Sequence, residues 1–260
     1  MAEFTLRPVR EDDKEALIRI FSASFGDGEA FVRDLTDSSA MLPDACCAEL
    51  DGEPRSCMFA FHGLSFGGVE SSYLYALCTA PDYRSLGLGR AVVAYSARRA
   101  REKGARCVFL KAADRGLQQW YMSAMGAQSV SPCEALPVRP ASSAERALPI
   151  SPLEYAALRR GPWQLPEKLL LAQDCINRHF GGAFLRLGGD CLCAEKTDRG
   201  ILVRELCAEY PGAILSSAAR YFGVRELMLL RPSPNGIPLL LLPSPGEEIS
   251  EPPLFPFPLD

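Results

Sequence analysis

Histidine is scarce in this chain of 260 residues, which contains only His62 and His179. The ten cysteines do not lie at the spacings that zinc sites use, so the sequence predicts no metal site. The net charge of −4 is small, and it gives no indication of a nucleic-acid-binding protein.

Long hydrophobic runs are also missing. No apolar run approaches the roughly 18 residues that a membrane-spanning helix needs, and the first residues contain no apolar core of a secretory signal. The sequence therefore predicts a cytoplasmic protein without a membrane partner. In that compartment cysteines are usually free thiols, and most of these lie in apolar runs that resemble buried strands.

The first half of the chain alternates between strand and helix patterns. Residues 4–9 favour a strand and residues 10–25 an amphipathic helix; a second short helix follows. Three extended runs come next, separated by hairpin signals at Asp51-Gly52 and Gly67-Gly68. The segment 81–104 then reads as a loop and a helix, and residues 105–132 as strand, helix and strand.

The second half partly repeats this order. Residues 132–152 hold five prolines and suggest a linker, after which the order of three strands, helix and strand returns. The last 29 residues hold nine prolines and predict an irregular tail. We therefore expect two domains, residues 1–140 and residues 141–260.

Two glycines mark the start of the helix in segment 81–104. The first amides of a helix lack backbone acceptors and carry a partial positive charge. Gly87 and Gly89 have no Cβ, so a phosphate could approach these amides closely, and Arg84 and Arg90 would add positive charge. The pattern predicts a phosphate-binding loop, although a plain strand-to-helix turn would also contain glycine.

The surrounding residues make the phosphate-binding interpretation more specific. The sequence "RSLGLG" fits the pattern R/Q-x-x-G-x-G/A and follows "ALCTAPDY", and "LQQWYMSAMGA" comes downstream. This arrangement resembles the GNAT superfamily of acyl-CoA-dependent N-acetyltransferases. The resemblance implies a mixed α/β (α+β) sheet of the GNAT fold over the first domain. The second domain would be a smaller, diverged GNAT-like domain, because it has no glycine pair at its helix start.

The resemblance also implies roles for individual residues. Tyr121 would act as the general acid toward the departing thiolate of acetyl-CoA. The strand end would hold the pantetheine arm, and the loop amides and flanking arginines would bind the diphosphate. The cofactor-binding positions are Leu77, Cys78, Thr79, Arg84, Ser85, Leu86, Gly87, Leu88, Gly89, Arg90 and Asp114.

Some positions depart from the family pattern. Asp114 stands where asparagine is frequent, and Ala127 stands where phenylalanine is usual. The position at which some relatives carry a glutamate base is Tyr73 here. Glu70 and His62 are the nearby candidates for the base, and the sequence does not choose between them.

The expected function is transfer of an acetyl group from acetyl-CoA to a primary amine of a small molecule or peptide. The alternative is a catalytically inactive module that binds or senses acyl-CoA. The sequence leaves the acceptor open, and it leaves open whether the protein is a monomer or a homodimer.

Overall fold

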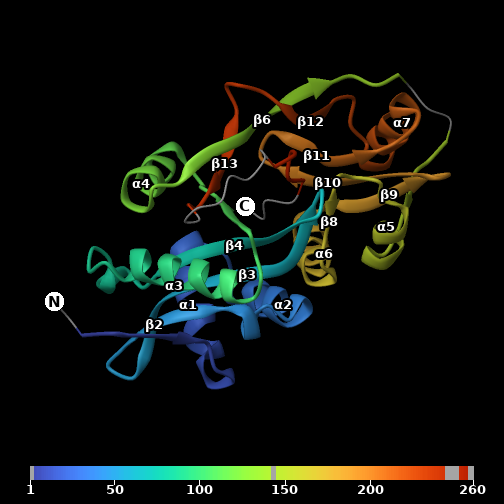
Figure 1. Ribbon diagram of the computed structural model, residues 1–260. Helices are drawn as coiled ribbons and strands as arrows, with labels where there is room; N and C mark the ends of the chain where they lie inside the picture. The colour runs from blue at the N-terminus through green and yellow to red at the C-terminus, as the bar shows by residue number, and fades with distance from the viewer. Residues whose placement is uncertain (1–2, 142–144, 244–251, 257–260) are drawn as a thin grey trace. The chain divides into compact units, whose positions relative to one another are not determined.

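The structure is a computed structural model that describes residues 3–141, 145–243 and 252–256 (Figure 1). Its contacts divide the chain into two compact units. The first contains residues 3–130, 239–243 and 252, and the second contains residues 131–141, 145–238 and 253–256. Among the described residues, no helix combines the length and the hydrophobicity that a bilayer crossing requires.

The first unit is built on a mixed sheet with the strand order β1-β2-β3-β4-β5-β13. Its neighbouring strands are antiparallel except β4 and β5, which are parallel. The strands are β1 (Thr5–Pro8), β2 (Cys46–Leu50), β3 (Glu53–Phe66), β4 (Val69–Thr79), β5 (Cys107–Lys111) and β13 (Ile237–Leu241). The helices are α1 (Lys14–Phe25), α2 (Glu29–Ser39), α3 (Leu88–Glu102) and α4 (Arg115–Met125), with 3-10 turns at Glu11–Asp13, Leu42–Asp44 and Pro81–Tyr83.

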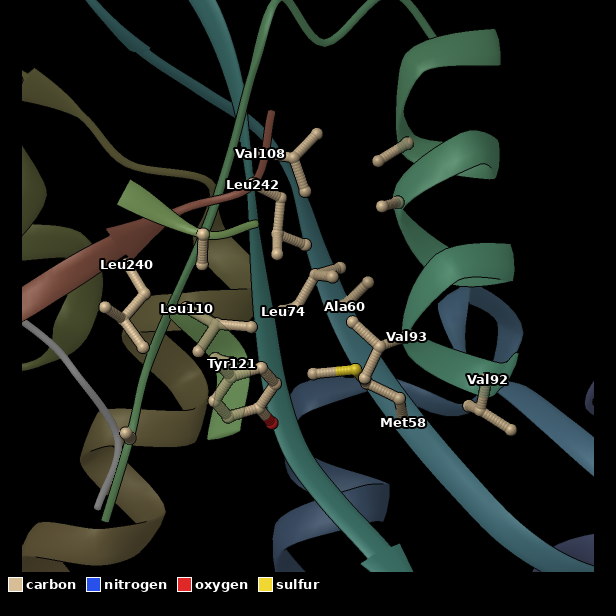
Figure 2. Packing of buried hydrophobic residues seen from close by; sticks show 14 of the residues in the cluster. Met58, Ala60, Leu74, Val92, Val93, Val108, Leu110, Tyr121, Leu240 and Leu242 are labelled. Carbon is tan, nitrogen blue, oxygen red and sulfur yellow. The ribbon is translucent and has the colours of Figure 1, made fainter. Parts of the chain in front are cut away.

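Alternate residues of the strands supply two different cores. Met58 and Ala60 of β3 join a cluster with residues of α3 and α4 on one face of the sheet (Figure 2). Phe59 and Phe61 point to the other face, where Phe59 packs against Phe21 of α1 with ring centroids 6.0 Å apart. This is the period of two that a sheet covered on both faces requires.

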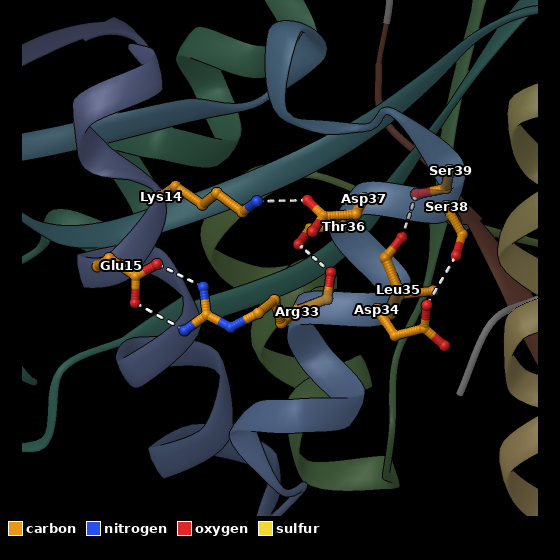
Figure 3. Close-up of polar contacts among 9 residues, drawn as sticks. All are labelled: Lys14, Glu15, Arg33, Asp34, Leu35, Thr36, Asp37, Ser38 and Ser39. Atoms are coloured by element: carbon orange, nitrogen blue, oxygen red, sulfur yellow. Dashed lines mark hydrogen bonds and ion pairs between the residues drawn. The ribbon is translucent and has the colours of Figure 1, made fainter.

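Helices α1 and α2 are joined by ion pairs on their exposed sides (Figure 3). Glu15 of α1 accepts two hydrogen bonds from Arg33 of α2, one of them 2.7 Å long, and Lys14 pairs with Asp37. The Arg33 guanidinium lowers the pKa of Glu15. Because these groups are solvated, we expect them to orient the two helices more than to stabilise the fold.

A buried ion pair joins β1 to the 3-10 turn that follows it. The Arg7 guanidinium donates to both carboxylate oxygens of Asp13, at 2.6 and 2.9 Å, and to Glu49 at 2.5 Å. Arg7 and Asp13 are 8% and 7% exposed. The hydrogen bonds from Arg7 hold the pKa of Asp13 below its usual value.

Replacing Asp13 by Asn is therefore expected to lower the free energy of unfolding by about 3 kcal/mol, because Arg7 stays buried without the carboxylate that accepts two of its hydrogen bonds. The lowered pKa means that the ionised Asp13 stabilises the fold above the unfolded pKa of about 4, and that this contribution is lost as the pH falls below it. Urea unfolding between neutral and acidic pH measures both effects. The exposed Asp37→Asn variant is the control, and an equally large loss there would contradict this account.

In the second unit the strands follow the order β6-β12-β11-β10-β9-β7, with both parallel and antiparallel neighbours. Its strands are β6 (Gln128–Val138), β7 (Leu148–Pro149), β8 (Trp163–Gln164), β9 (Ala183–Leu187), β10 (Asp190–Thr197), β11 (Gly200–Cys207) and β12 (Leu227–Pro232). Its helices are α5 (Pro152–Leu158), α6 (Glu167–Phe180) and α7 (Pro211–Phe222). The order β9-β10-β11-α7-β12 matches β2-β3-β4-α3-β5, and each series ends in a parallel pair of strands. The predicted repetition of element order is thus confirmed.

Two proline-rich segments differ from their prediction. Strand β6 continues to Val138, inside the predicted linker, and pairs with β12 from Cys133 to Val138. Strand β13 lies within the predicted irregular tail, and its Leu239–Leu241 part pairs with β5. Proline is tolerated at strand positions where no ladder N–H is required, so long-range pairing overrode the local signal. Outside this strand, the predicted tail is described at residues 232–236, 242–243 and 252–256.

Candidate active site

The two parallel strands of the first unit separate near their carboxyl ends. Register pairs between β4 and β5 run from Ser71 with Cys107 to Leu74 with Leu110. Beyond Leu74, β4 continues to Thr79 without a partner on the β5 side in the register. The backbone groups along this edge of β4 can therefore bond an extended ligand in the way that an added strand would.

A β-bulge lies in β4 just past the point of separation. Cys57 pairs with Cys78 and Phe59 with Tyr75, so Ala76 and Leu77 together face Met58. Ala76 has φ +53°, which is uncommon for a residue with a Cβ. Bulges of this kind bend a strand and redirect its amides, and they are frequent beside active sites.

The chain then enters α3 through an exposed loop. Ser85 and Gly87 have φ values of +63° and +83°, and Gly87 is the N-cap of α3. A Cβ on Gly87 would meet no atom within 4 Å, so open space lies over this position. The first helical bond runs from Ala91 N–H to the Gly87 carbonyl at 3.1 Å, which leaves the preceding amides of the helix outside the helical ladder.

Gly89 lies close to the end of β4. A Cβ there would come within 3.6 Å of Thr79 Oγ1 and 3.7 Å of a Leu77 methyl group. Arg84 donates from Nε to the Thr79 carbonyl at 3.3 Å, and Arg84 and Arg90 are both exposed. The structure thus brings the predicted strand end (Leu77, Cys78, Thr79) together with the predicted loop (Arg84, Ser85, Leu86, Gly87, Leu88, Gly89, Arg90). Leu88 alone in this loop is buried, because it anchors α3 in the core.

Tyr121 of α4 lies in the same core cluster as Leu74 and Leu110 (Figure 2). Leu88 also belongs to this cluster. Leu74 and Leu110 are the last pair before the strands separate, and Leu88 is the first residue of α3. Tyr121 is 2% exposed, and its burial raises the pKa of the phenol above the usual 10. The ring also makes an edge contact with Trp120, with centroids 4.9 Å apart. The phenol is therefore a proton-bearing group at every physiological pH.

Asp114 has a defined structural partner. It is the N-cap of α4, and its Oδ1 accepts a hydrogen bond from the Leu117 N–H at 2.7 Å. A capping carboxylate stabilises the start of a helix. The side chain of Asp114 therefore holds the helix that carries Tyr121.

The two candidates for the base lie away from this region. Glu70 is exposed at the start of β4, four residues before Leu74, where the strands separate, which corresponds to roughly 13 Å along a strand. His62 lies opposite Ser72 on the neighbouring strand, and its Nδ1 is 2.8 Å from Ser72 Oγ. His62 Nε2 also lies 3.9 Å from Asp44, which is bonded to Lys103 at the far end of α3. The structure does not bring either residue to the separation of the strands.

The bulge at Ala76 could not be predicted from the sequence. Only the left-handed conformation and the shifted register reveal it, and no glycine or proline marks the position. A local sequence signal could not have identified it, since alanine usually avoids positive φ.

Comparison with known proteins agrees with this geometry. The model of the acetyltransferase (GNAT) family matches residues 14–127, which include β4, the loop, α3 and α4. No curated protein matches the chain. Many solved structures share its fold.

Three of these solved structures cover most of the chain. A GCN5-related N-acetyltransferase from Kribbella flavida is 16% identical, with a TM-score of 0.65, over 92% of this chain and 70% of that one. One from Anabaena variabilis is 13% identical, with a TM-score of 0.66, over 92% of this chain and 72% of that one. One from Sphaerobacter thermophilus is 17% identical, with a TM-score of 0.54, over 92% of this chain and 94% of that one. At these identities the similarity concerns the fold, and it extends over both units.

Proposed function

Since residues 14–127 form a GNAT acetyltransferase domain, we propose that this protein transfers the acetyl group of acetyl-CoA to a primary amine of a small molecule or a peptide. The observation that carries the proposal is the juxtaposition of two features. A glycine-containing helix start with open space above it lies directly beside Leu77 and Thr79, at the end of β4 that has no register partner on the β5 side.

The helix start is suited to the diphosphate of acetyl-CoA. The amides from Ser85 to Arg90 precede or open α3, where the helix dipole favours negative charge. Gly87 leaves the space above these amides open, and the exposed Arg84 and Arg90 supply cationic donors.

The free edge of β4 is suited to the pantetheine arm. Leu77, Cys78 and Thr79 follow the bulge and have no register partner on the β5 side. Amide groups of the arm can bond to this edge like an additional strand. An arm that runs along β4 from Thr79 toward Leu77 brings the thioester toward Ala76, where the redirected backbone amides could polarise the acyl carbonyl.

The reaction itself is attack of a neutral amine on the thioester with loss of a thiolate. An alkyl amine with pKa near 10.4 pays about 4.6 kcal/mol to lose its proton at pH 7, so the reaction accelerates as the pH rises. Tyr121 interacts with the leaving thiolate. Its burial raises the pKa of the phenol, so it stabilises the forming thiolate by donating a hydrogen bond, without complete early proton transfer.

One observation favours the alternative of a catalytically inactive acyl-CoA-binding module. Neither Glu70 nor His62 lies at the separation of the strands, so neither can act there as the base that removes the proton of the amine. Acetyl transfer then requires either that water takes up the proton or that the acceptor binds as the small fraction of amine that is already neutral. The inactive module would bind acetyl-CoA and release no thiol in response to amines.

A thiol-release assay across a panel of primary amines separates the two functions. The panel should include alkyl, aromatic and polyamine compounds and peptides with a free N-terminus or lysine, each paired with its trimethylated analogue. We expect release of CoA that depends on at least one primary amine, is absent with its trimethylated form, and increases with pH. Saturable binding of acetyl-CoA with no amine-dependent release in the whole panel would contradict transfer and support the inactive module.

A further inference from the structure

The parallel strands of the second unit also separate, and a pocket opens at that point. Strands β11 and β12 pair only at Leu202 with Met228 and Val203 with Leu229. The pocket has a volume of about 720 Å³, and both strands line it beyond these pairs. Its lining includes Arg160, Arg204, Glu205, Cys207 and Arg231.

This pocket lacks the phosphate-binding loop of the first unit. The amides of Glu209 and Tyr210, which precede α7, donate to the carboxylate of Asp190 at 3.0 and 3.5 Å. Pro211 begins the helix and has no N–H. An internal carboxylate thus occupies the amides that a diphosphate would need, so the pocket suits a different ligand.

The distinctive feature of the pocket is a pair of cysteines, one of which lines it. Cys191 near the start of β10 and Cys207 at the end of β11 are direct cross-strand partners. Directly opposed residues in antiparallel strands have Cα atoms roughly 4.5–5.5 Å apart, which is within the range that a disulfide bond spans. Cys191 is fully buried, and Cys207 is 7% exposed and lines the pocket.

Hydrogen bonds favour a thiolate on Cys207. The Cys191 thiol donates to Cys207 and lowers the pKa of Cys207 to about 7, and the Arg160 N–H and the nearby Arg159 act in the same direction. Burial and the Glu205 carboxylate oppose this shift. Glu205 is itself neutralised by Arg159 and accepts a hydrogen bond from the Tyr155 hydroxyl at 2.6 Å.

The first unit holds a second cysteine pair in a different environment. Cys57 and Cys78 are cross-strand partners with Sγ atoms 3.2 Å apart, but they are 0% and 2% exposed. The contact with Cys78 and the burial raise the pKa of Cys57 well above its usual value. This pair therefore has the proximity of the other one, but the pKa of Cys57 is raised and neither cysteine lines that pocket.

We propose that Cys207 and Cys191 form a dithiol that exchanges with low-molecular-weight disulfides entering the pocket of the second unit. The Cys207 thiolate attacks one sulfur of the small disulfide, whose S–S bond breaks with loss of one thiolate, and a mixed disulfide forms. Cys191 then gives up its proton and attacks Cys207 Sγ, which releases the second thiolate. The cysteine pair is oxidised to a disulfide, and the small disulfide is reduced to two thiols.

The test uses the full-length protein with glutathione disulfide as the probe. Intact mass and disulfide mapping are expected to show one bond, between Cys191 and Cys207. The initial rate is expected to rise roughly tenfold per pH unit below about pH 7 and to level off above it, as the thiolate fraction does. The Cys191→Ser variant lacks the resolving thiol, so it should accumulate the mixed disulfide at Cys207.

The Cys207→Ser and Cys57→Ser variants complete the test. We expect Cys207→Ser to lose the reaction and Cys57→Ser to keep the rate of the natural sequence. Oxidation of Cys57 with Cys78 at an equal rate, a disulfide map without the Cys191–Cys207 bond, or unchanged oxidation in Cys207→Ser would each overturn the proposal.

Discussion

Gly87→Glu is expected to weaken binding of CoA by at least about 100-fold, as measured by calorimetry. The reason is charge at the helix start: a carboxylate over the amides that open α3 competes with the diphosphate and repels it. Gly87 has open space around it, so the new side chain meets no neighbour that would disrupt the core. The substitution does carry a backbone cost, because φ is +83° and a residue with a Cβ disfavours this conformation by about 1–2 kcal/mol.

The matched control is Gly104→Glu, at the other end of the same helix. Gly104 has φ +95° and equally open surroundings, so the backbone strain and the added charge are similar. Circular dichroism is expected to show comparable stability for the two variants, with CoA affinity retained only in Gly104→Glu. Equal affinities in the two variants would show that the loop does not bind the diphosphate.

Tyr121→Phe is expected to lower kcat by about 100-fold while KM for acetyl-CoA changes little. The phenylalanine keeps the ring in its cluster with Leu74 and Leu110 and removes only the hydroxyl that would donate to the leaving sulfur. An interaction that exists only as the thiolate forms affects kcat and not ground-state binding.

The leaving group gives a readout that a structural role would not change. With an aromatic thioester, whose thiol has a lower pKa, the departing sulfur needs less stabilisation. The ratio of kcat between the natural sequence and Tyr121→Phe should therefore fall toward one. Trp120→Phe, which alters the neighbouring ring, is the control and should affect both thioesters equally. A Tyr121→Phe defect of the same size with both thioesters would assign the residue a packing role alone.

Several features of the site could be predicted from the sequence because they depend on neighbouring residues. The helix start at Gly87 and Gly89, the arginines beside it and the position of Tyr121 on its helix are all set within short segments. Helix ends, turns and periodic apolar faces are local properties, so the sequence carries them directly. The repeated order of elements in the two halves could be predicted for the same reason.

Other features depend on residues far apart in the chain. Glu70 lies close to the site in sequence, yet the length of β4 carries it to the opposite end of the strand. The prolines of β6 and β13 predicted irregular chain, but pairing with β12 and β5 supplied hydrogen bonds that a local pattern cannot show.

The sequence by itself determined where the glycine-containing start of α3 lies and which family pattern surrounds it. Only the tertiary structure decided that β4 parts from β5 beside that helix and that Cys207, which lines a pocket, lies opposite Cys191 on the neighbouring strand. The physical reason is that strand register arises from contacts between distant segments. The conformation of a turn or a helix end is set by the few residues that form it.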